Sequence, residues 1–418
     1  MSSGRVYVIG AGLAGLSAAM HLAELGATIT LIEGANQAGG RCRSYFDAAL
    51  DQVIDNGNHL VLSGNPAVSR YVQKIGATQL LTGPEHARFA FFDTRSGARW
   101  TIRPNDGPLA WWILAPKRRV PGTSPRDYLS ILNLLIARPD APVESVISCH
   151  GALWENLLAP LLLAALNTDP RTASAGLAAA VLRQTLFKGG RAYCPRIATP
   201  HLADAFITPA LAHLARQKTR IILGKRVRKL QFEADRVTSL ELAGESIALA
   251  REDKIVLAVP AWVAADLVPG VCVPDAFRSI INGHFALPAP PNAEPILGVI
   301  GGVAEWIFAF SDRLSVTVSG ADRLLDEDRD SLARRLWADV ARAHGLTCPL
   351  PRWQIVKERR ATFAATPEQD RRRPGPVTSW RNLVLAGDWV RTGLPATIEG
   401  ALRSGETAAQ LILRGDRA

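Results

Sequence analysis

Short apolar runs recur along the chain, and the first of them leads directly into a pattern with helical spacing. Residues 6–9 contain two valines and an isoleucine, and such β-formers predict a buried strand. Apolar residues recur at helical spacing over residues 13–26, and the glycine at the end of this range is typical of a helix C-terminus. Residues 28–32 predict a second strand. The chain therefore begins with a predicted strand–helix–strand unit.

Three glycines with the spacing G-x-G-x-x-G connect the first predicted strand to the helix. Gly10 allows a tight turn, Gly12 lets the backbone approach a pyrophosphate, and Gly15 lets the helix pack close to the sheet. Ala11 and Ala14 stand between them, where the free N–H groups of the helix N-terminus attract phosphate oxygens. This pattern predicts a dinucleotide-binding site.

Glu33 follows the second predicted strand and completes the pattern. A carboxylate at this point accepts hydrogen bonds from both ribose hydroxyls and repels a 2′-phosphate, which disfavours NADP. Gly39, Gly40 and Arg41 come next, and a glycine pair before an arginine leaves room for a backbone beside a phosphate and adds a cation. This spacing resembles the flavoprotein superfamily that includes amine oxidases and carotenoid desaturases, and it favours FAD.

The last apolar run, residues 382–386, predicts a strand that is followed by a loop and a C-terminal helix. The helix N-terminus would stabilise negative charge on a reduced flavin. Asp388 is expected to bind ribityl hydroxyls. The predicted cofactor contacts in this part of the chain are Gly387, Asp388, Thr397 and Ile398.

The superfamily resemblance implies further contacts. In these flavoproteins an Asp-x-Gly element approaches the isoalloxazine ring, and the matching residues here include Asn56 and Gly57. A valine at the position of Val227 contacts the adenine through its backbone. His59, two residues beyond Gly57, is a candidate for a direct role at the flavin or the substrate.

Longer segments make the resemblance narrower. Residues 386–405 are similar to the C-terminal signature of the squalene-associated FAD-dependent desaturases, the bacterial hydroxysqualene dehydroxylases. Residues 55–59, 165–170 and 357–367 agree with the same family, so the resemblance spans almost the full chain. Asn58 stands where the family more often has glutamine, and it retains an amide.

The resemblance implies an α/β fold of the amine-oxidase and phytoene-desaturase type. A Rossmann-like FAD-binding domain is expected beside an α+β substrate domain with a helical lid. Residues 1–85, 196–265 and 376–418 are assigned to the FAD-binding domain. Residues 86–195, which include the lid, and residues 266–375 are assigned to the substrate domain.

The implied reaction is the FAD-dependent reduction of hydroxysqualene to squalene, a step in the biosynthesis of squalene and hopanoids. Hydride from the reduced flavin replaces an allylic hydroxyl group on a C30 isoprenoid lipid. The reaction requires a general acid, for which His59 is the first candidate and Glu399 the second. The electron donor that reduces the flavin is unknown.

Two other interpretations stay open. A carotenoid-type desaturase would remove hydride from its substrate, and an amine oxidase would need an aromatic cage that the sequence does not locate. A prenyl-binding scaffold of the same general fold would hold a lipid without catalysis. The intact glycine motifs, Glu33 and Asp388 favour a functional FAD site over such a scaffold.

The net charge and the cysteine spacing restrict the kinds of molecule that the protein is expected to bind. The chain has 418 residues, enough for two domains, and a net charge of +10. No nucleic-acid-binding module is recognisable, so the charge favours an anionic membrane surface. The five cysteines have neither a disulfide-framework pattern nor metal-binding spacing, so no metal is expected, and they fit a reducing cytoplasm.

Any membrane contact is expected to be peripheral. The nucleotide motif begins almost at the N-terminus, which leaves no signal peptide, and no run of about 20 apolar residues is free of charge and proline. Trp111 and Trp112 stand close to Lys117, Arg118 and Arg119, a combination that fits a lipid–water interface and, equally well, a buried helix with a solvated charged end. We expect a cytoplasmic protein on the inner face of the cell membrane.

Overall fold

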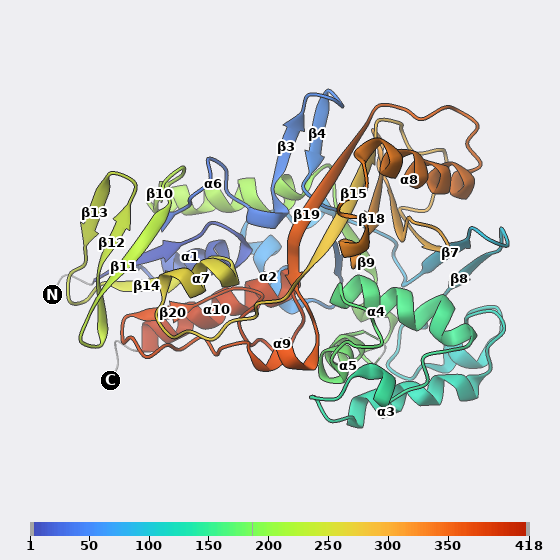
Figure 1. Ribbon diagram of the computed structural model, residues 1–418, viewed down its shortest axis with the longest axis horizontal. Helices are drawn as coiled ribbons and strands as arrows, with labels where there is room; N and C mark the ends of the chain where they lie inside the picture. The colour runs from blue at the N-terminus through green and yellow to red at the C-terminus, as the bar shows by residue number, and fades with distance from the viewer. Residues whose placement is uncertain (1–3, 186, 415–418) are drawn as a thin grey trace.

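A five-stranded parallel sheet lies at the centre of the region on the left of Figure 1, in a computed structural model that describes residues 4–185 and 187–414. Its inner strands are buried on both faces, which explains why they consist mainly of aliphatic residues. In spatial order the strands are β10 (Arg220–Ile222), β2 (Thr28–Ile32), β1 (Arg5–Ile9), β14 (Lys254–Leu257) and β20 (Leu383–Leu385).

The two faces of this sheet have different coverings. Alternate side chains of β1, such as Val6 and Val8, join a core formed with four helices. The intervening side chains, Tyr7 and Ile9, face a three-stranded antiparallel sheet and one short helix. The four helices are α1 (Leu13–Glu24), α2 (Pro66–Lys74), α6 (Thr208–Arg216) and α10 (Ile398–Arg414). The second covering consists of β11 (Val227–Glu233), β12 (Arg236–Leu242), β13 (Glu245–Ala248) and α7 (Ala261–Leu267).

A seven-stranded sheet forms the second region, on the right of Figure 1. Neighbouring strands are antiparallel except for β16 and β7, which pair in parallel. In spatial order the strands are β19 (Trp353–Phe363), β15 (Phe277–Phe285), β18 (Leu314–Val318), β17 (Trp306–Ala309), β16 (Ile296–Ile300), β7 (Phe89–Asp93) and β8 (Arg99–Ile102).

The helix α8 (Arg329–His344) covers one face of the seven-stranded sheet. The side chain of Asp328 caps its N-terminus by accepting a hydrogen bond from the N–H group of Ser331, and Gly345 ends it in the left-handed conformation. Its apolar side recurs at helical spacing through Leu336 and Val340, both fully buried. The local sequence thus determines both the ends of the helix and its buried side.

Helices between residues 130 and 184 form a lid beside the seven-stranded sheet, at the lower right of Figure 1. The chain reaches them through short 3-10 turns at Trp111–Leu114 and Pro125–Leu129. A π-helical turn, Trp154–Leu158, precedes the second helix. The lid helices are α3 (Ser130–Ile136), α4 (Ala159–Leu166) and α5 (Ala175–Gln184), and a short helix outside the lid is α9 (Pro367–Arg371).

Two small sheets lie where the chain passes between the two regions. One is a hairpin of β3 (Ser44–Asp47) and β4 (Gln52–Asp55), and the other joins β5 (Leu60–Leu62), β9 (Pro195–Ala198) and β6 (Leu81–Thr82). The two large sheets draw their strands from alternating parts of the chain. None of the helices among the described residues is both long enough and apolar enough to cross a membrane.

Close packing between α1 and α10 depends on a glycine. A Cβ atom added at Gly405 would lie 2.2 Å from the carbonyl oxygen of Ala14 and 2.8 Å from the Cβ atom of Ser17. Both neighbours belong to α1, whose N-terminus carries the glycine motif. The distance between these helices therefore helps to place the start of α1.

We expect the substitution Gly405→Ala to lower the free energy of unfolding by about 1–3 kcal/mol, because the added methyl group overpacks the contact. Alanine is the better helix former, so a decrease must come from the steric contact. Urea unfolding would measure it. Gly375→Ala is the matched control because no heavy atom lies within 4 Å of its added Cβ. Equal stability of the two variants would contradict the packing argument.

Candidate active site

The turn between β1 and α1 combines two crowded glycines with one open glycine. Gly10 has a φ angle of +105°, and a Cβ atom added to it would lie 2.3 Å from the carbonyl oxygen of Ala258. A Cβ atom at Gly15 would lie 1.9 Å from the carbonyl oxygen of Gly10. At Gly12, in contrast, no heavy atom lies within 4 Å. The turn therefore packs tightly against the sheet and leaves space above its middle glycine.

The N-terminus of α1 borders this space. No side chain caps the helix at Gly12, and its first turn, which includes Ala14, contains no acidic residue. Gly39 donates its N–H group to the carbonyl oxygen of Ala11 at 2.8 Å. A Cβ atom at Gly40 would lie 3.6 Å from the Cα atom of Gly12. Uncapped N–H groups next to open space form a favourable site for phosphate oxygens.

Glu33 forms hydrogen bonds both to the glycine turn and to the segment that leads into β11. Its carboxylate accepts hydrogen bonds from the N–H groups of Ala11, at 2.7 Å, and Ala35, at 2.8 Å. Its carbonyl oxygen accepts one from the N–H group of Lys225 at 2.9 Å. This last bond brings the start of β11, with the buried Val227, to the same end of the sheet. The predicted ribose and adenine contacts are thus brought together.

An ion pair joins the first and last segments of the chain. The Nη2 atom of Arg41 lies 2.8 Å from the Oδ1 atom of Asp388. Asp388 follows Gly387, whose N–H group donates to the Oγ atom of Ser404 at 2.9 Å. The side chain of Arg41 is 41% exposed, whereas that of Asp388 is only 9% exposed. The carboxylate is thus held in place, and the guanidinium group, whose Nη1 atom donates to the carbonyl oxygen of Ala361, stays partly exposed.

Helix α10 begins shortly after Asp388 in the sequence. The Oγ1 atom of Thr397 accepts a hydrogen bond from the N–H group of Gly400 at 3.0 Å, and Ile398 is buried. Thr397 therefore acts as a helix cap in this structure. Its role as a cofactor contact, like that of Ile398, stays a prediction.

Arg373 holds the loop after β20, and the sequence analysis missed it. Its side chain is fully buried and donates to the carbonyl oxygens of Asp388, Trp389 and Val390 at 2.7–3.3 Å. It also pairs with Asp370 at 2.9 Å. In the sequence it is the last of three consecutive arginines, which resemble a solvated charge run. No local pattern distinguishes it from its neighbours.

The segment from Asp55 to His59 lies against the middle of the seven-stranded sheet. Asn56 donates its amide to the Oε2 atom of Glu358 at 3.2 Å. The N–H group of Asn58 donates to the Oδ1 atom of Asn282, on β15, at 3.3 Å. A Cβ atom at Gly57 would lie 3.0 Å from the amide nitrogen of Asn282, so glycine permits this close approach.

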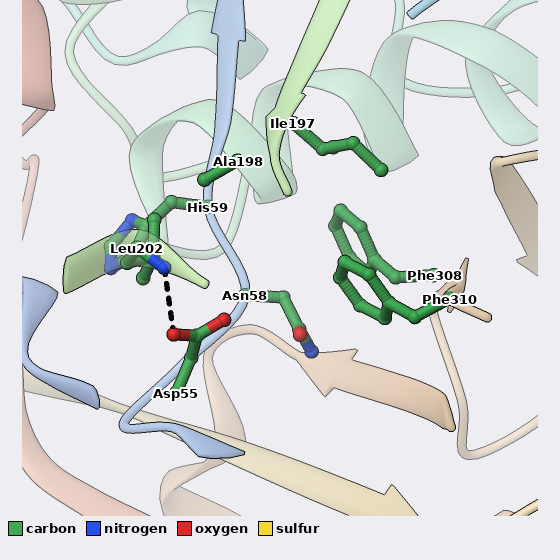
Figure 2. Close-up of a pocket in the computed structure, with 8 residues that line it drawn as sticks. All are labelled: Asp55, Asn58, His59, Ile197, Ala198, Leu202, Phe308 and Phe310. Carbon is green, nitrogen blue, oxygen red and sulfur yellow. Dashed lines mark hydrogen bonds between the residues drawn. The ribbon is translucent and has the colours of Figure 1, made fainter. Parts of the chain in front are cut away.

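His59 lines a pocket that Figure 2 shows. Burial, together with the positive charge of Arg41, lowers the pKa of His59 to about 4. The ring is therefore neutral at pH 7, so it can offer one N–H donor and one acceptor but holds no extra proton. This charge state weakens the case for His59 as the general acid, a role that stays a prediction.

Glu399 has structural partners. Its carboxylate accepts hydrogen bonds from the N–H groups of Ala67 and Val68 at 3.0 Å, in the first turn of α2. It also pairs with the Nε atom of Arg403 at 2.6 Å. A buried carboxylate in this position caps α2 and ties it to α10. These contacts favour a structural role, although the general-acid role predicted for Glu399 has not been tested.

The fold and the glycine turn define a class of protein. Residues 13–413 match the family model of flavin containing amine oxidoreductases, so the chain belongs to that family. The cyclohexylamine oxidase from Brevibacterium oxydans shares the fold, with a TM-score of 0.71 at 15% sequence identity and full coverage of both chains.

Within this class the chain belongs to the hydroxysqualene dehydroxylase family. It is 51% identical over 414 residues to the hydroxysqualene dehydroxylase of Rhodopseudomonas palustris, covering 99% of each chain. It is 46% identical over 407 residues to that of Zymomonas mobilis, covering 97% of this chain and 98% of the relative. The family resemblance inferred from the sequence is thereby confirmed.

FAD is the cofactor of this chain, and the residues present fit it. Open space above Gly12 and the uncapped α1 N-terminus suit the pyrophosphate. Glu33 lies at the end of β2, where it suits the ribose. The FAD contacts predicted from the sequence, as individual residues, stay predictions.

We expect Glu399→Gln to lower the free energy of unfolding by about 1–3 kcal/mol, because the first turn of α2 loses a charged acceptor. Turnover per bound flavin, in contrast, should fall only slightly. Thermal unfolding and turnover normalised to flavin absorbance would separate the two effects. A hundredfold loss of turnover with unchanged stability would instead support Glu399 as the general acid.

Proposed function

We propose that this chain reduces hydroxysqualene to squalene. The observation that carries the proposal is its similarity, over nearly the full length, to two proteins named hydroxysqualene dehydroxylase. Reduced FAD, when bound, supplies the hydride for the allylic carbon. The protein's part is to bind the lipid, orient its hydroxyl group and exclude water from the reacting carbon.

The lid and the seven-stranded sheet offer an apolar surface for a C30 isoprenoid chain. Helix α4 consists only of alanine, leucine and one proline. A Cβ atom at Gly320, just after β18, would lie 3.3 Å from the Cδ1 atom of Leu163, so the lid packs directly on the sheet edge. We propose that the substrate chain lies along this apolar surface, beside the contact between Leu163 and Gly320, with its hydroxyl group near His59.

The first test is an anaerobic incubation of flavin-loaded protein with hydroxysqualene and a chemical reductant. We expect squalene to form together with reoxidation of the flavin, as read by mass spectrometry and absorbance. Intact hydroxysqualene beside fully reduced flavin would contradict the proposal and favour a carotenoid-type desaturase or an amine oxidase. A protein that stays colourless after FAD addition would favour a non-catalytic prenyl-lipid scaffold.

We propose further that the lid edge contacts an anionic membrane surface from the cytoplasmic side. Exposed large apolar side chains concentrate in this part of the chain, and Ile136 and Leu109 are 85% and 80% exposed. Leu129, Leu132 and Ile136 follow one side of α3 and the turn before it. The lid edge comprises Leu109, Trp111, Leu114, Leu129, Leu132 and Ile136.

Only one of the two neighbouring tryptophans belongs to this edge. Trp111 is 51% exposed, whereas Trp112 is 2% exposed and packs edge-on against Tyr128 at 5.6 Å between ring centroids. The expectation that both rings suit the interface is therefore wrong for Trp112. The guanidinium group of Arg118 lies 4.6 Å from the ring of Trp111, which places a cation beside the exposed ring. Cations near anionic headgroups contribute about 1 kcal/mol each.

Sedimentation with vesicles would test the lid edge. We expect the double substitution Trp111→Ser and Ile136→Ser to reduce partitioning onto phosphatidylglycerol vesicles at least tenfold, because two apolar side chains lose their burial in lipid. Leu25→Ser with Val377→Ser is the matched control, since both residues are exposed outside the lid. Equal losses in both pairs, or equal binding to neutral vesicles, would refute this surface.

A further inference from the structure

A small pocket beside His59, with about 10 Å³ of open space, is lined by apolar side chains and three polar ones. Phe308 and Phe310 lie on one side of it, and Asp55 and His59 lie on the other (Figure 2). A space of this size accommodates a single hydroxyl group or water molecule, which the polar atoms can orient. The lining residues are Asp55, Asn58, His59, Ile197, Ala198, Leu202, Phe308 and Phe310.

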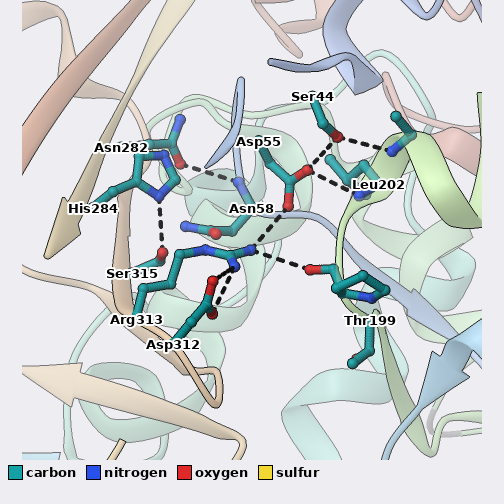
Figure 3. A network of polar contacts seen from close by, with 12 residues as sticks. Ser44, Asp55, Asn58, Thr199, Leu202, Asn282, His284, Asp312, Arg313 and Ser315 are labelled. Atoms are coloured by element: carbon teal, nitrogen blue, oxygen red, sulfur yellow. Dashed lines mark hydrogen bonds and ion pairs between the residues drawn. The ribbon is translucent and has the colours of Figure 1, made fainter. Parts of the chain in front are cut away.

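The two carboxyl oxygens of Asp55 differ in their contacts, as Figure 3 shows. Oδ1 accepts short hydrogen bonds from the hydroxyl group of Ser44, at 2.6 Å, and the N–H group of Leu202, at 2.9 Å. Oδ2 has one long contact, 3.4 Å from the Nη2 atom of Arg313. Asp55 itself is 2% exposed. One oxygen is therefore fully engaged, and the other is weakly held.

Arg313 is shared between two carboxylates. Its Nη1 atom lies 2.9 Å from Asp312, closer than its contact with Asp55, and its side chain is only 1% exposed. It also donates to the carbonyl oxygen of Pro200 at 3.3 Å. Asp312 is 45% exposed, so water also stabilises its charge, whereas a negative charge on Asp55 has only this long, shared contact with a cation. Burial makes that charge costly, which favours the protonated form of Asp55.

The other titratable groups near Asp55 supply no second cation. Burial and the charge of Arg313 lower the pKa of His201, and they lower that of His284 to about 3. Both imidazoles are therefore neutral at pH 7. Burial raises the pKa of Cys42 to about 12, so its thiol is neutral as well. Burial likewise raises the pKa of Asp55 above its ordinary value, despite its hydrogen bonds and Arg313.

Asn58 presents a fixed acceptor to the same pocket. Its amide nitrogen donates to the Oγ1 atom of Thr317, at 3.1 Å, and to the carbonyl oxygen of Val316, at 3.4 Å. These bonds determine which way the amide is turned. The Oδ1 atom is buried and has no hydrogen-bond partner among the described residues. A buried acceptor without a donor is unfavourable, and a ligand hydroxyl group would satisfy it.

We propose that Asp55 is the catalytic proton donor of the dehydroxylation and that Asn58 orients the substrate hydroxyl group. This inference rests on the proposed function of the chain. The hydroxyl hydrogen is donated to the Oδ1 atom of Asn58, which turns a lone pair of the hydroxyl oxygen toward the carboxyl group of Asp55.

The carboxyl proton of Asp55 moves to the hydroxyl oxygen, the allylic C–O bond breaks, and water leaves with the bonding electron pair. The allylic carbon then receives the hydride and its electron pair. Asp55 is left as a carboxylate and regains a proton from solvent before the next turnover. The aromatic rings of Phe308 and Phe310, which line the pocket, favour positive charge on the allylic carbon and limit trapping by water.

The deciding variant is Asp55→Asn, assayed in a single turnover of prereduced enzyme with hydroxysqualene. We expect the rate to fall at least a hundredfold, because an amide cannot supply the proton. Flavin absorbance and thermal unfolding would establish that the variant is folded and loaded. Asp47→Asn is the matched control, because Asp47 is another buried aspartate of the same β-hairpin that does not line the pocket. Its rate should stay within about threefold of wild type.

A second measurement remains decisive even if Asp55→Asn does not fold. A general acid must be protonated, so the wild-type rate should decrease as pH rises through the pKa of Asp55. Ser44→Ala removes a hydrogen bond that favours the carboxylate, which raises this pKa further. The alkaline limb of the pH profile should therefore move to higher pH in Ser44→Ala.

Two results would overturn the proposal: a folded Asp55→Asn enzyme with at least a third of the wild-type rate, or an alkaline limb that does not move in Ser44→Ala. Failure of the proposed function looks different, because wild-type enzyme would then form no squalene at any pH. The Asn58 assignment is tested by Asn58→Leu, which should weaken hydroxysqualene binding at least tenfold while squalene binding changes by less than threefold.

Discussion

The ion pair between Arg41 and Asp388 is the contact on which the cofactor site depends. It joins the segment after β2 to the segment after β20, and each of these segments follows a strand of the same parallel sheet. Parallel strands end at one edge, so residues far apart in the sequence meet there without long loops. The pair then holds the segments that carry the predicted cofactor contacts at one edge of the sheet.

Burial controls the charge on both sides of this pair. His59, His284 and Cys42 are all held neutral by their surroundings, and Arg41 and Arg313 are the cations nearest to them. These three side chains therefore add no charge to the site at pH 7, and the carboxyl group of Asp55 is the group that we propose loses and regains a proton. Such a separation suits a reaction in which a cationic carbon must meet a hydride and avoid water.

The cofactor motif and the fold class could be predicted from the sequence because each depends on short-range patterns. The spacing of Gly10, Gly12 and Gly15 within a strand–helix–strand unit has a direct structural reason, which the crowded contacts confirm. Arg373 could not be singled out in this way, and Asp55 could be recognised only as the first residue of the Asp-x-Gly element, without a catalytic role. Their surroundings come from loops distant in the sequence, and burial, which gives each its importance, is a property of the folded chain.

The strand order of the parallel sheet also has a consequence for biosynthesis. The strand β14 lies between β1 and β20, and β20 ends at Leu385 in a chain of 418 residues. A nascent chain on the ribosome therefore lacks one edge of its sheet, together with Asp388 and α10, until β20 and the residues after it have emerged. The parallel sheet can therefore be completed only after its last strand and the helix that follows it have been synthesised.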